Sequence, residues 1–146
     1  MARKEKEIKN TRGLTFVLGA SRLGANIASL LNEKNVDIVI VDHDILAFNK
    51  LPDSFGGLKL LGDALDQEFL ASNDIQNAKR VIIVTDDDNI NILVAHICFY
   101  IFKIENVYIR LIDTEKGTLL DDTTIKAFYP FSLSKNTLIS LMEGEK

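Results

Sequence analysis

The segment from residue 14 to residue 42 limits the fold of this chain more than any other part of it. It opens with a continuous apolar run over residues 14–18, which is typical of a parallel strand covered on both faces. The run breaks at Gly19, and apolar residues then recur at helical spacing on one stripe. A second apolar run over residues 36–41 ends on Asp42. The segment therefore predicts a strand, a glycine turn, a helix and a second parallel strand.

The predicted turn reads Gly19-Ala20-Ser21-Arg22-Leu23-Gly24. It matches the G-x-G-x-x-G pattern of dinucleotide-binding turns at its first and third glycines and has Ser21 at the second. Asp42 follows Gly24 by 18 residues, close to the spacing of roughly 20 at which an acidic residue binds a ribose hydroxyl in that fold. The helix after the turn also directs unpaired N–H groups toward an anion. These features predict a nucleotide site; the alternative is a glycine turn that serves packing alone.

The serine in this turn leaves two outcomes open for phosphate binding. A glycine at its position normally lets the backbone approach the pyrophosphate closely. The Ser21 hydroxyl would either donate a hydrogen bond to a phosphate oxygen or exclude a second phosphate.

Two related motifs do not fit the same residues. A P-loop requires lysine and then serine or threonine after its last glycine, where this chain has Ala25 and Asn26, which argues against a phosphate-cleaving NTPase. A short-chain dehydrogenase needs a lysine four residues after its tyrosine. Tyr100 and Lys103 are three apart, and neither of the other two tyrosines has a lysine at that offset.

The rest of the chain continues to alternate strands and helices. We expect strands at residues 58–61, 81–84, 107–111 and 127–129, a short helical stretch at 45–51, a helix at 67–71 capped by Asp66, and a helix at about 89–102. This alternation predicts an α/β fold: a Rossmann-like, doubly wound parallel sheet of about six strands with helices on both faces.

In such a sheet, ligands bind beyond the carboxyl ends of the strands. The predicted strand ends carry the glycine turn, Asp42 with His43 beside it, Gly62-Asp63 and Thr85-Asp86. Arg22 is the basic side chain expected to offset phosphate charge, and Asp42 would repel a 2′-phosphate. The crevice therefore favours NAD(H) or another adenine nucleotide over NADP(H).

The predicted helix at 89–102 is apolar almost all round. This pattern indicates a second buried face, either under other segments of the chain or against another subunit. We expect core roles for His96 and Cys98, and a helix cap at Asp88 or Asn89. Three consecutive aspartates at 86–88 cannot all face one ion from regular structure, so no metal site is expected there.

Length and composition narrow the function further. A chain of 146 residues suits one domain, and its net charge of −4 gives no support for nucleic-acid binding. The longest apolar stretch, residues 92–102, is too short for a membrane span, and one cysteine cannot form an intrachain disulfide. We therefore expect a cytoplasmic protein. Residues 1–12 are rich in charge and predict a flexible, solubilising tail; the alternative is attachment to an anionic membrane surface.

Several motifs together resemble one family. They are FVLGASRLG, VIVDHD, LLGDALDQEFL, AKRVIIVTDDDNIN, ENVYIRLID and FYPFSLSKNTL, and they extend over almost the whole chain. In this order they resemble the RCK domain, also called KTN or TrkA-N, of potassium channel and transporter regulators.

The resemblance implies a Rossmann-like regulatory domain that binds NAD(H) or ATP, ADP or AMP without chemistry. It also implies a homodimer or larger ring that contacts a membrane potassium channel or transporter from the cytoplasmic side. By position, the glycine turn would face phosphate, Asp42 the ribose, Asp63 the adenine, and Thr85 and Asp86 the crevice floor. The full set of candidate binding residues is Gly19, Ala20, Ser21, Arg22, Leu23, Gly24, Asp42, His43, Gly62, Asp63, Thr85, Asp86 and Arg110.

We expect residues 13–146 to form a single nucleotide-binding domain that ends in a crossover helix without a second lobe. No combination of residues indicates a catalytic site, so a regulatory subunit is the favoured function. The alternative is a small NAD-dependent oxidoreductase subunit that a partner completes.

Overall fold

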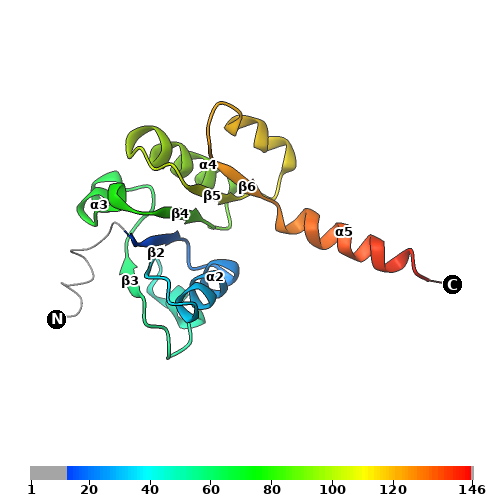
Figure 1. Ribbon diagram of the computed structural model, residues 1–146, viewed down its shortest axis with the longest axis horizontal. Helices are drawn as coiled ribbons and strands as arrows, with labels where there is room; N and C mark the ends of the chain where they lie inside the picture. Colours follow the sequence, from blue (N-terminus) through cyan, green and yellow to red (C-terminus); the bar gives the residue numbers. More distant parts are fainter. Residues whose placement is uncertain (1–12, 146) are drawn as a thin grey trace.

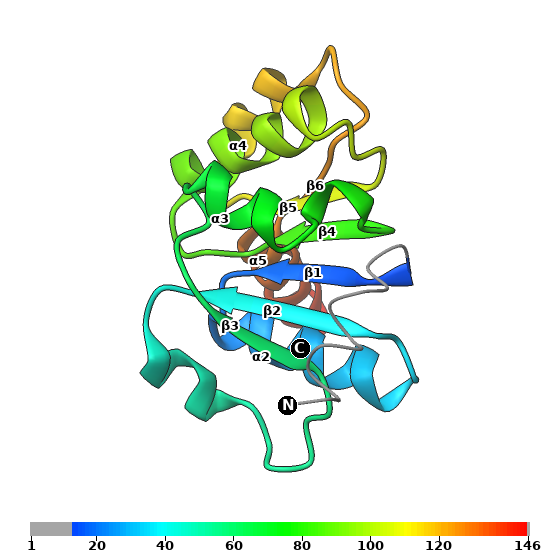
Figure 2. The same cartoon turned by 90° about the vertical axis from the view of Figure 1, so that its left-hand side faces the viewer.

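A computed structural model describes residues 13–145 of the chain (Figure 1). The predicted charged tail at residues 1–12 lies outside the described residues. The strands are β1 (Thr15–Leu18), β2 (Ile38–Asp42), β3 (Leu58–Leu61), β4 (Arg80–Ile83), β5 (Val107–Arg110) and β6 (Lys126–Phe128). All are parallel, in the order β3-β2-β1-β4-β5-β6, as Figure 2 shows. The predicted doubly wound sheet is confirmed, with strand ends shifted by one or two residues.

The helical segments connect these strands. They are α2 (Arg22–Glu33), α3 (Gln67–Ser72), α4 (Asp88–His96) and α5 (Pro130–Met142), the short 3₁₀ segments η2 (Ile45–Lys50), η3 (Ile75–Asn77) and η5 (Thr114–Leu120), and the π-helical turn η4 (Ile97–Ile101). The predicted cap of α3 is confirmed, since the Asp66 carboxylate accepts a hydrogen bond from the Phe69 N–H.

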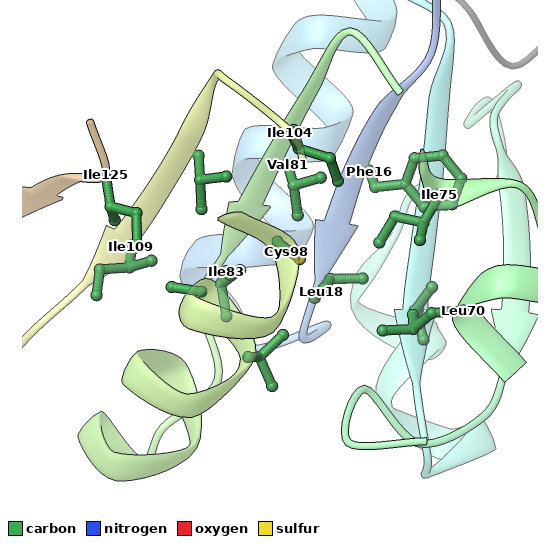
Figure 3. Packing of buried hydrophobic residues seen from close by; sticks show 14 of the residues in the cluster. Phe16, Leu18, Leu70, Ile75, Val81, Ile83, Cys98, Ile104, Ile109 and Ile125 are labelled. Atoms are coloured by element: carbon green, nitrogen blue, oxygen red, sulfur yellow. The ribbon is translucent and has the colours of Figure 1, made fainter. Parts of the chain in front are cut away.

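Alternate residues of the central strand pack into two separate cores. Phe16 and Leu18 of β1 join a cluster with α3 and α4, which Figure 3 shows around Cys98 and Leu70. Val17, between them, packs on the opposite face with α2 and η2. The period of two in the side-chain directions of a strand explains this division, and helices therefore cover both faces of the sheet.

The order of the strands determines where a ligand can bind. From β1 the chain runs outward through β2 and β3, and then returns to the other side of β1 with β4. The order thus reverses between β1 and β4. In open α/β sheets, a crevice forms at this point, beyond the carboxyl ends of the two strands.

The cap of α4 differs from the prediction that Asp88 or Asn89 would fill it. The N-cap is Asp87, whose carboxylate accepts hydrogen bonds from the N–H groups of Asn89 and Ile90 at 2.8 and 3.1 Å. The Asp88 carboxylate turns instead to the chain after β5, where it accepts from the N–H groups of Ile112 and Asp113. That prediction is wrong because these two N–H groups, about 24 positions away in sequence, bind the Asp88 carboxylate. The local sequence pattern does not show this tertiary contact.

The predicted single helix at 89–102 is also divided in two. After His96 the backbone widens into the π turn η4, where the Phe102 N–H donates to the Ile97 carbonyl at 3.1 Å. Cys98 is fully buried in this turn, as predicted, and burial raises the pKa of its thiol to about 12. His96 is only partly buried, and its Nε2 lies 3.1 Å from the Leu119 carbonyl.

Two apolar surfaces remain uncovered in the described chain. Leu93, Tyr100 and Ile101 are about half exposed on α4 and η4. The helix α5 extends away from the sheet (Figure 1) and has no buried residue. Its large exposed apolar side chains are Phe131, Leu133, Leu138, Ile139, Leu141 and Met142. Between residues 13 and 145, no helix is long and apolar enough to cross a bilayer.

Candidate functional site

A cavity of about 550 Å³ opens at the predicted position, beyond the carboxyl ends of the strands. It lies where the strand order reverses, and segments that follow β1, β2, β3 and β4 all contribute to it. Its lining residues are Gly19, Ala20, Ser21, Val41, Asp42, His43, Asp44, Ala47, Lys50, Gly62, Asp63, Ala64, Leu65, Thr85, Asp86, Asp87 and Ile90.

The two glycines of the turn have separate steric reasons to be glycine. Gly19 has a φ of 106°, and a Cβ there would lie 2.8 Å from the Thr85 backbone nitrogen. A Cβ on Gly24 would overlap the Gly19 carbonyl oxygen and lie 2.8 Å from the Val84 side chain. The glycines thus allow α2 to start close against the ends of β1 and β4.

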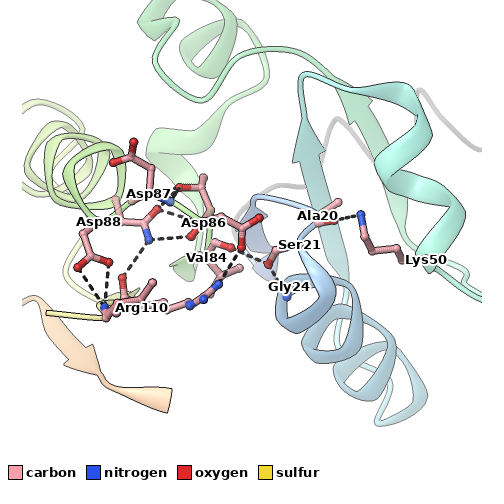
Figure 4. A network of polar contacts seen from close by, with 12 residues as sticks. Ala20, Ser21, Gly24, Lys50, Val84, Asp86, Asp87, Asp88 and Arg110 are labelled. Atoms are coloured by element: carbon pink, nitrogen blue, oxygen red, sulfur yellow. Dashed lines mark hydrogen bonds and ion pairs between the residues drawn. The ribbon is translucent and has the colours of Figure 1, made fainter. Parts of the chain in front are cut away.

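Ser21 joins the glycine turn to the end of β4. Its hydroxyl donates to the Val84 carbonyl at 2.7 Å and accepts from the Gly24 N–H at 3.1 Å, which makes it the N-cap of α2 (Figure 4). The side chain is buried. Because the hydroxyl proton is donated to Val84, Ser21 positions the turn in this structure and does not present a donor to the cavity.

The Asp42 carboxylate is held against the same turn from the β2 side. Its Oδ2 accepts from the Ala20 N–H at 2.8 Å, and its Oδ1 accepts from the Asp44 N–H at 2.9 Å. Only 14% of the side chain is exposed, whereas that of the neighbouring His43 is 82% exposed. The carboxylate therefore has a fixed orientation, with lone pairs left on both oxygens for a hydroxyl donor.

The β4 side of the cavity depends on one buried amide. Asn91, on the first turn of α4, is fully buried. Its oxygen accepts from the Thr85 N–H at 3.2 Å and from the Thr85 hydroxyl. Its nitrogen donates to the carbonyls of Thr85 at 3.1 Å and Arg110 at 2.9 Å. Asn91 thus connects the ends of β4 and β5 and fixes Thr85 in the cavity wall.

Arg110 does not line the cavity, but it contacts Asp86, which does. Its guanidinium donates to the Asp86 carboxylate at 3.0 Å, as Figure 4 shows. Only 20% of the Arg110 side chain is exposed, against 82% for Asp86. This ion pair holds Asp86 at the end of β4.

Most of the predicted binding residues come together in this cavity. Nine of them line it: Gly19, Ala20, Ser21, Asp42, His43, Gly62, Asp63, Thr85 and Asp86. Four do not: Arg22, Leu23, Gly24 and Arg110. The Arg22 side chain is exposed on α2, and this expected cation does not line the cavity.

Sequence reasoning missed the lysine that does line the cavity. This residue is Lys50, the last residue of η2, whose Nζ donates a hydrogen bond to the Ala20 carbonyl at 3.2 Å. No motif marks this residue, because it lies 30 positions from the turn that it contacts. The one signal that could have found it is its place in the segment that follows β2 and Asp42. Within residues 13–145, no cluster of three or more histidine, cysteine, aspartate or glutamate side chains is arranged to bind a metal ion.

Comparison with known proteins identifies the family of this chain. Residues 15–129 match the TrkA-N domain model. The chain is 31% identical, over 101 residues, to "Trk system potassium uptake protein TrkA" of Streptomyces coelicolor, an alignment that covers 69% of this chain and 45% of that protein. The matches span about half the length of the first curated relatives and about a fifth of the length of others.

Solved structures show the same fold. A structure titled "GsuK channel bound to NAD" has a TM-score of 0.75 at 24% identity, covering 89% of this chain and 23% of that one. A second, titled "Crystal structure of the GsuK bound to ADP", has a TM-score of 0.77 at 22% identity, covering 96% of this chain and 36% of that one. At these identities the likeness establishes the fold. Together with the family match, it shows that the chain belongs to the TrkA-N domain family.

Proposed function

We propose that this chain is a nucleotide-binding regulatory domain of a potassium uptake or channel system, and that it binds NAD(H) or an adenine nucleotide without consuming it. The observation that carries the proposal is the Asp42 carboxylate, held 2.8 Å from the Ala20 N–H beside a cavity of about 550 Å³. This is the arrangement by which a dinucleotide fold binds a ribose next to its phosphate turn. The relative named for Trk potassium uptake and the structures titled with NAD and ADP support the physiological setting.

Each part of an adenine nucleotide has a matching part of the cavity. The remaining lone pairs of Asp42 suit the ribose hydroxyls, and its charge disfavours a 2′-phosphate. Phosphate would lie at the N-terminus of α2, where the first N–H groups have no intrahelical acceptor. Ala64 and Leu65, after β3, supply apolar surface beside Asp63 for the adenine.

The lining suits binding better than turnover. Among the described lining residues, His43 is the one histidine, and its side chain is mostly exposed, so the wall does not hold it against a bound ligand in a fixed orientation. The buried groups of the wall, Ser21 and Asn91, are engaged by backbone partners. A ligand that is held and released unchanged is what a regulatory domain requires.

The apolar surfaces support assembly. A helix of 13 residues such as α5 is marginal in water when nothing packs against it. Its exposed apolar residues, together with Leu93, Tyr100 and Ile101, offer surface to a second copy of this chain and to further subunits. We propose a homodimer or larger ring that acts on the inner face of the membrane through its potassium-conducting partner. In that assembly, residues 13–129 form the nucleotide lobe and α5 forms the crossover.

A thermal-shift panel with NAD⁺, NADH, NADPH, AMP, ADP and ATP tests the nucleotide site. A ligand at 100 times its dissociation constant stabilises by about 2.7 kcal/mol, which raises the midpoint by roughly 10 °C for a domain of this size. We expect a shift with at least one adenine nucleotide, and its loss in Asp42→Ala. Asp37→Ala is the matched control, because Asp37 is exposed just before the other end of β2. Absence of any shift with the unmodified chain would contradict the proposal.

A further inference from the structure

The charge around the cavity is strongly one-sided. Its lining includes the aspartates Asp42, Asp44, Asp63, Asp86 and Asp87. Within the described part of the chain, Lys50 is the only lysine or arginine that lines it. A nucleotide must place its phosphates in this cavity, so the balance of charge limits which nucleotide can enter.

Lys50 is placed where phosphate would lie. Its Nζ donates to the carbonyl of Ala20, inside the turn that precedes α2, and Figure 4 shows it reaching the turn from the side opposite Asp86. Ala47 and Phe48, on the same short segment, are buried and anchor its backbone. The distance of 3.2 Å is at the long end for an N–H···O bond, and the side chain is exposed. The ammonium can therefore exchange the carbonyl for a phosphate oxygen.

The aspartates are held in place by the protein. Oxygens of Asp42, Asp44, Asp63 and Asp87 accept backbone N–H groups of neighbouring turns at 2.8–3.1 Å. The fifth, Asp86, accepts from the Arg110 guanidinium. Their negative charge stays at the wall, since turning away would break these bonds. Arg110 offsets the charge of Asp86, and within residues 13–145 no cluster of these aspartates is arranged to hold a metal ion that would offset the others.

Resting on the nucleotide-binding function above, we propose that Lys50 determines ligand specificity: its ammonium binds the one or two phosphates next to the ribose, and the fixed aspartates exclude nucleotides with more. The cavity then selects a ligand of low net negative charge, NAD⁺ or AMP, against ATP. Physiological salt screens charges over about 8 Å, so phosphates inside a cavity lined by carboxylates are not screened from them.

Titration calorimetry of the full chain in a buffer with EDTA tests this proposal. We expect affinity to fall in the order AMP, ADP, ATP, with ATP weaker than AMP by about tenfold or more, and NAD⁺ to bind at least as well as AMP. Lys50→Gln should weaken NAD⁺ and AMP by roughly ten- to a hundredfold, the effect of losing one charge-assisted hydrogen bond. Lys79→Gln is the control, because Lys79 is exposed just before the amino end of β4 and should leave both affinities unchanged.

A second variant tests the repulsion between the aspartates of the cavity wall and the phosphates of the nucleotide. Asp86→Asn removes one charge and keeps an acceptor for Arg110, so it should raise the affinity for ATP more than that for AMP. Added Mg²⁺ should likewise narrow the gap between AMP and ATP, since it offsets phosphate charge. The proposal is overturned if ATP binds the unmodified chain as tightly as AMP in EDTA, if Lys50→Gln changes nothing, or if neither Asp86→Asn nor Mg²⁺ narrows the gap. If none of the nucleotides binds the unmodified chain, the proposed function itself fails.

Discussion

The carboxylate of Asp42 and the backbone N–H of Ala20, 22 positions apart in sequence, form a 2.8 Å hydrogen bond that joins the turn after β1 to the end of β2. The bond places the carboxylate that we propose to bind the ribose against the turn that we propose to bind phosphate. Preorganisation of this kind lowers the cost of ordering the site when a nucleotide binds. The two hydrogen bonds of Asp42 thus hold its carboxylate in the orientation that the proposed site requires.

Ser21→Ala should destabilise the domain. The substitution removes the N-cap of α2 and leaves the buried Val84 carbonyl without its side-chain donor. We expect a loss of about 1–2 kcal/mol in the free energy of unfolding, measured by urea denaturation. Ser54→Ala, in an exposed loop, should change it by less than about 0.5 kcal/mol. Equal effects of the two substitutions would show that the Ser21 hydroxyl contributes nothing to stability.

Gly24→Ala should be more damaging than its size suggests. The new Cβ would overlap the Gly19 carbonyl oxygen, so the turn and α2 would have to move apart. We expect a loss of about 2 kcal/mol or more in the free energy of unfolding, and weaker nucleotide binding. Gly13→Ala is the control, because a Cβ at Gly13 has no neighbour within 4 Å among the described residues. A Gly24→Ala protein as stable as the Gly13→Ala protein would refute the steric role of the glycine.

Asn91→Ala should loosen the β4 side of the cavity. It leaves the Thr85 N–H and the Arg110 carbonyl without the amide that joins them. Unsatisfied buried groups of this kind cost about 3 kcal/mol together. Amide hydrogen exchange at Thr85 should accelerate, and nucleotide affinity should fall. Asn89→Ala, on the exposed side of the same helix, should leave exchange at Thr85 unaltered. Unchanged protection of Thr85 in Asn91→Ala would count against this role.

Cys98 should make the stability of the domain depend on alkaline pH. Burial raises the pKa of its thiol from 9.0 to about 12, so the unfolded chain loses this proton at a lower pH than the folded one. The contribution of the buried, neutral Cys98 thiol to the free energy of unfolding is fully present below pH 9.0 and is lost as the pH rises toward about 12. Urea denaturation at pH 8 and at pH 10 should therefore show a larger drop in stability for the unmodified chain than for Cys98→Ala. A drop of the same size in both would contradict this assignment.

The sequence predicted the parts of the site that depend on short segments and on the order of the strands. The apolar run, the glycine turn and the acidic end of β2 lie within one segment of 29 residues, and the structure places Gly19 and Asp42 at the same cavity. Parallel alternation of strands then predicted that Gly62, Asp63 and Thr85 would meet them there. These residues could be found because backbone topology alone brings strand ends together.

Residues whose place depends on tertiary contacts could not be found in this way. Lys50 was missed because its side chain reaches from η2 to the Ala20 carbonyl, a contact 30 positions away in sequence. The cation expected in the cavity, Arg22, does not line it and is exposed to solvent in the first turn of α2. The cap of α4 was assigned to Asp88 or Asn89, one or two residues after Asp87, because the Asp88 carboxylate accepts hydrogen bonds from the backbone after β5 instead. In each case the deciding partner lies more than 20 positions away or in solvent.

The most direct measurement is a ¹H–¹⁵N NMR titration of the chain with NAD⁺, followed at assigned backbone amides. If the cavity binds the nucleotide, the largest shift changes fall on Gly19, Ala20 and Leu23 in the turn, on His43 and Asp44 after β2, and on Thr85. Shift changes confined to the opposite edge of the sheet, around Asn106 and Val107, would contradict the site, and a spectrum unchanged at saturating NAD⁺, AMP and ADP would contradict nucleotide binding altogether.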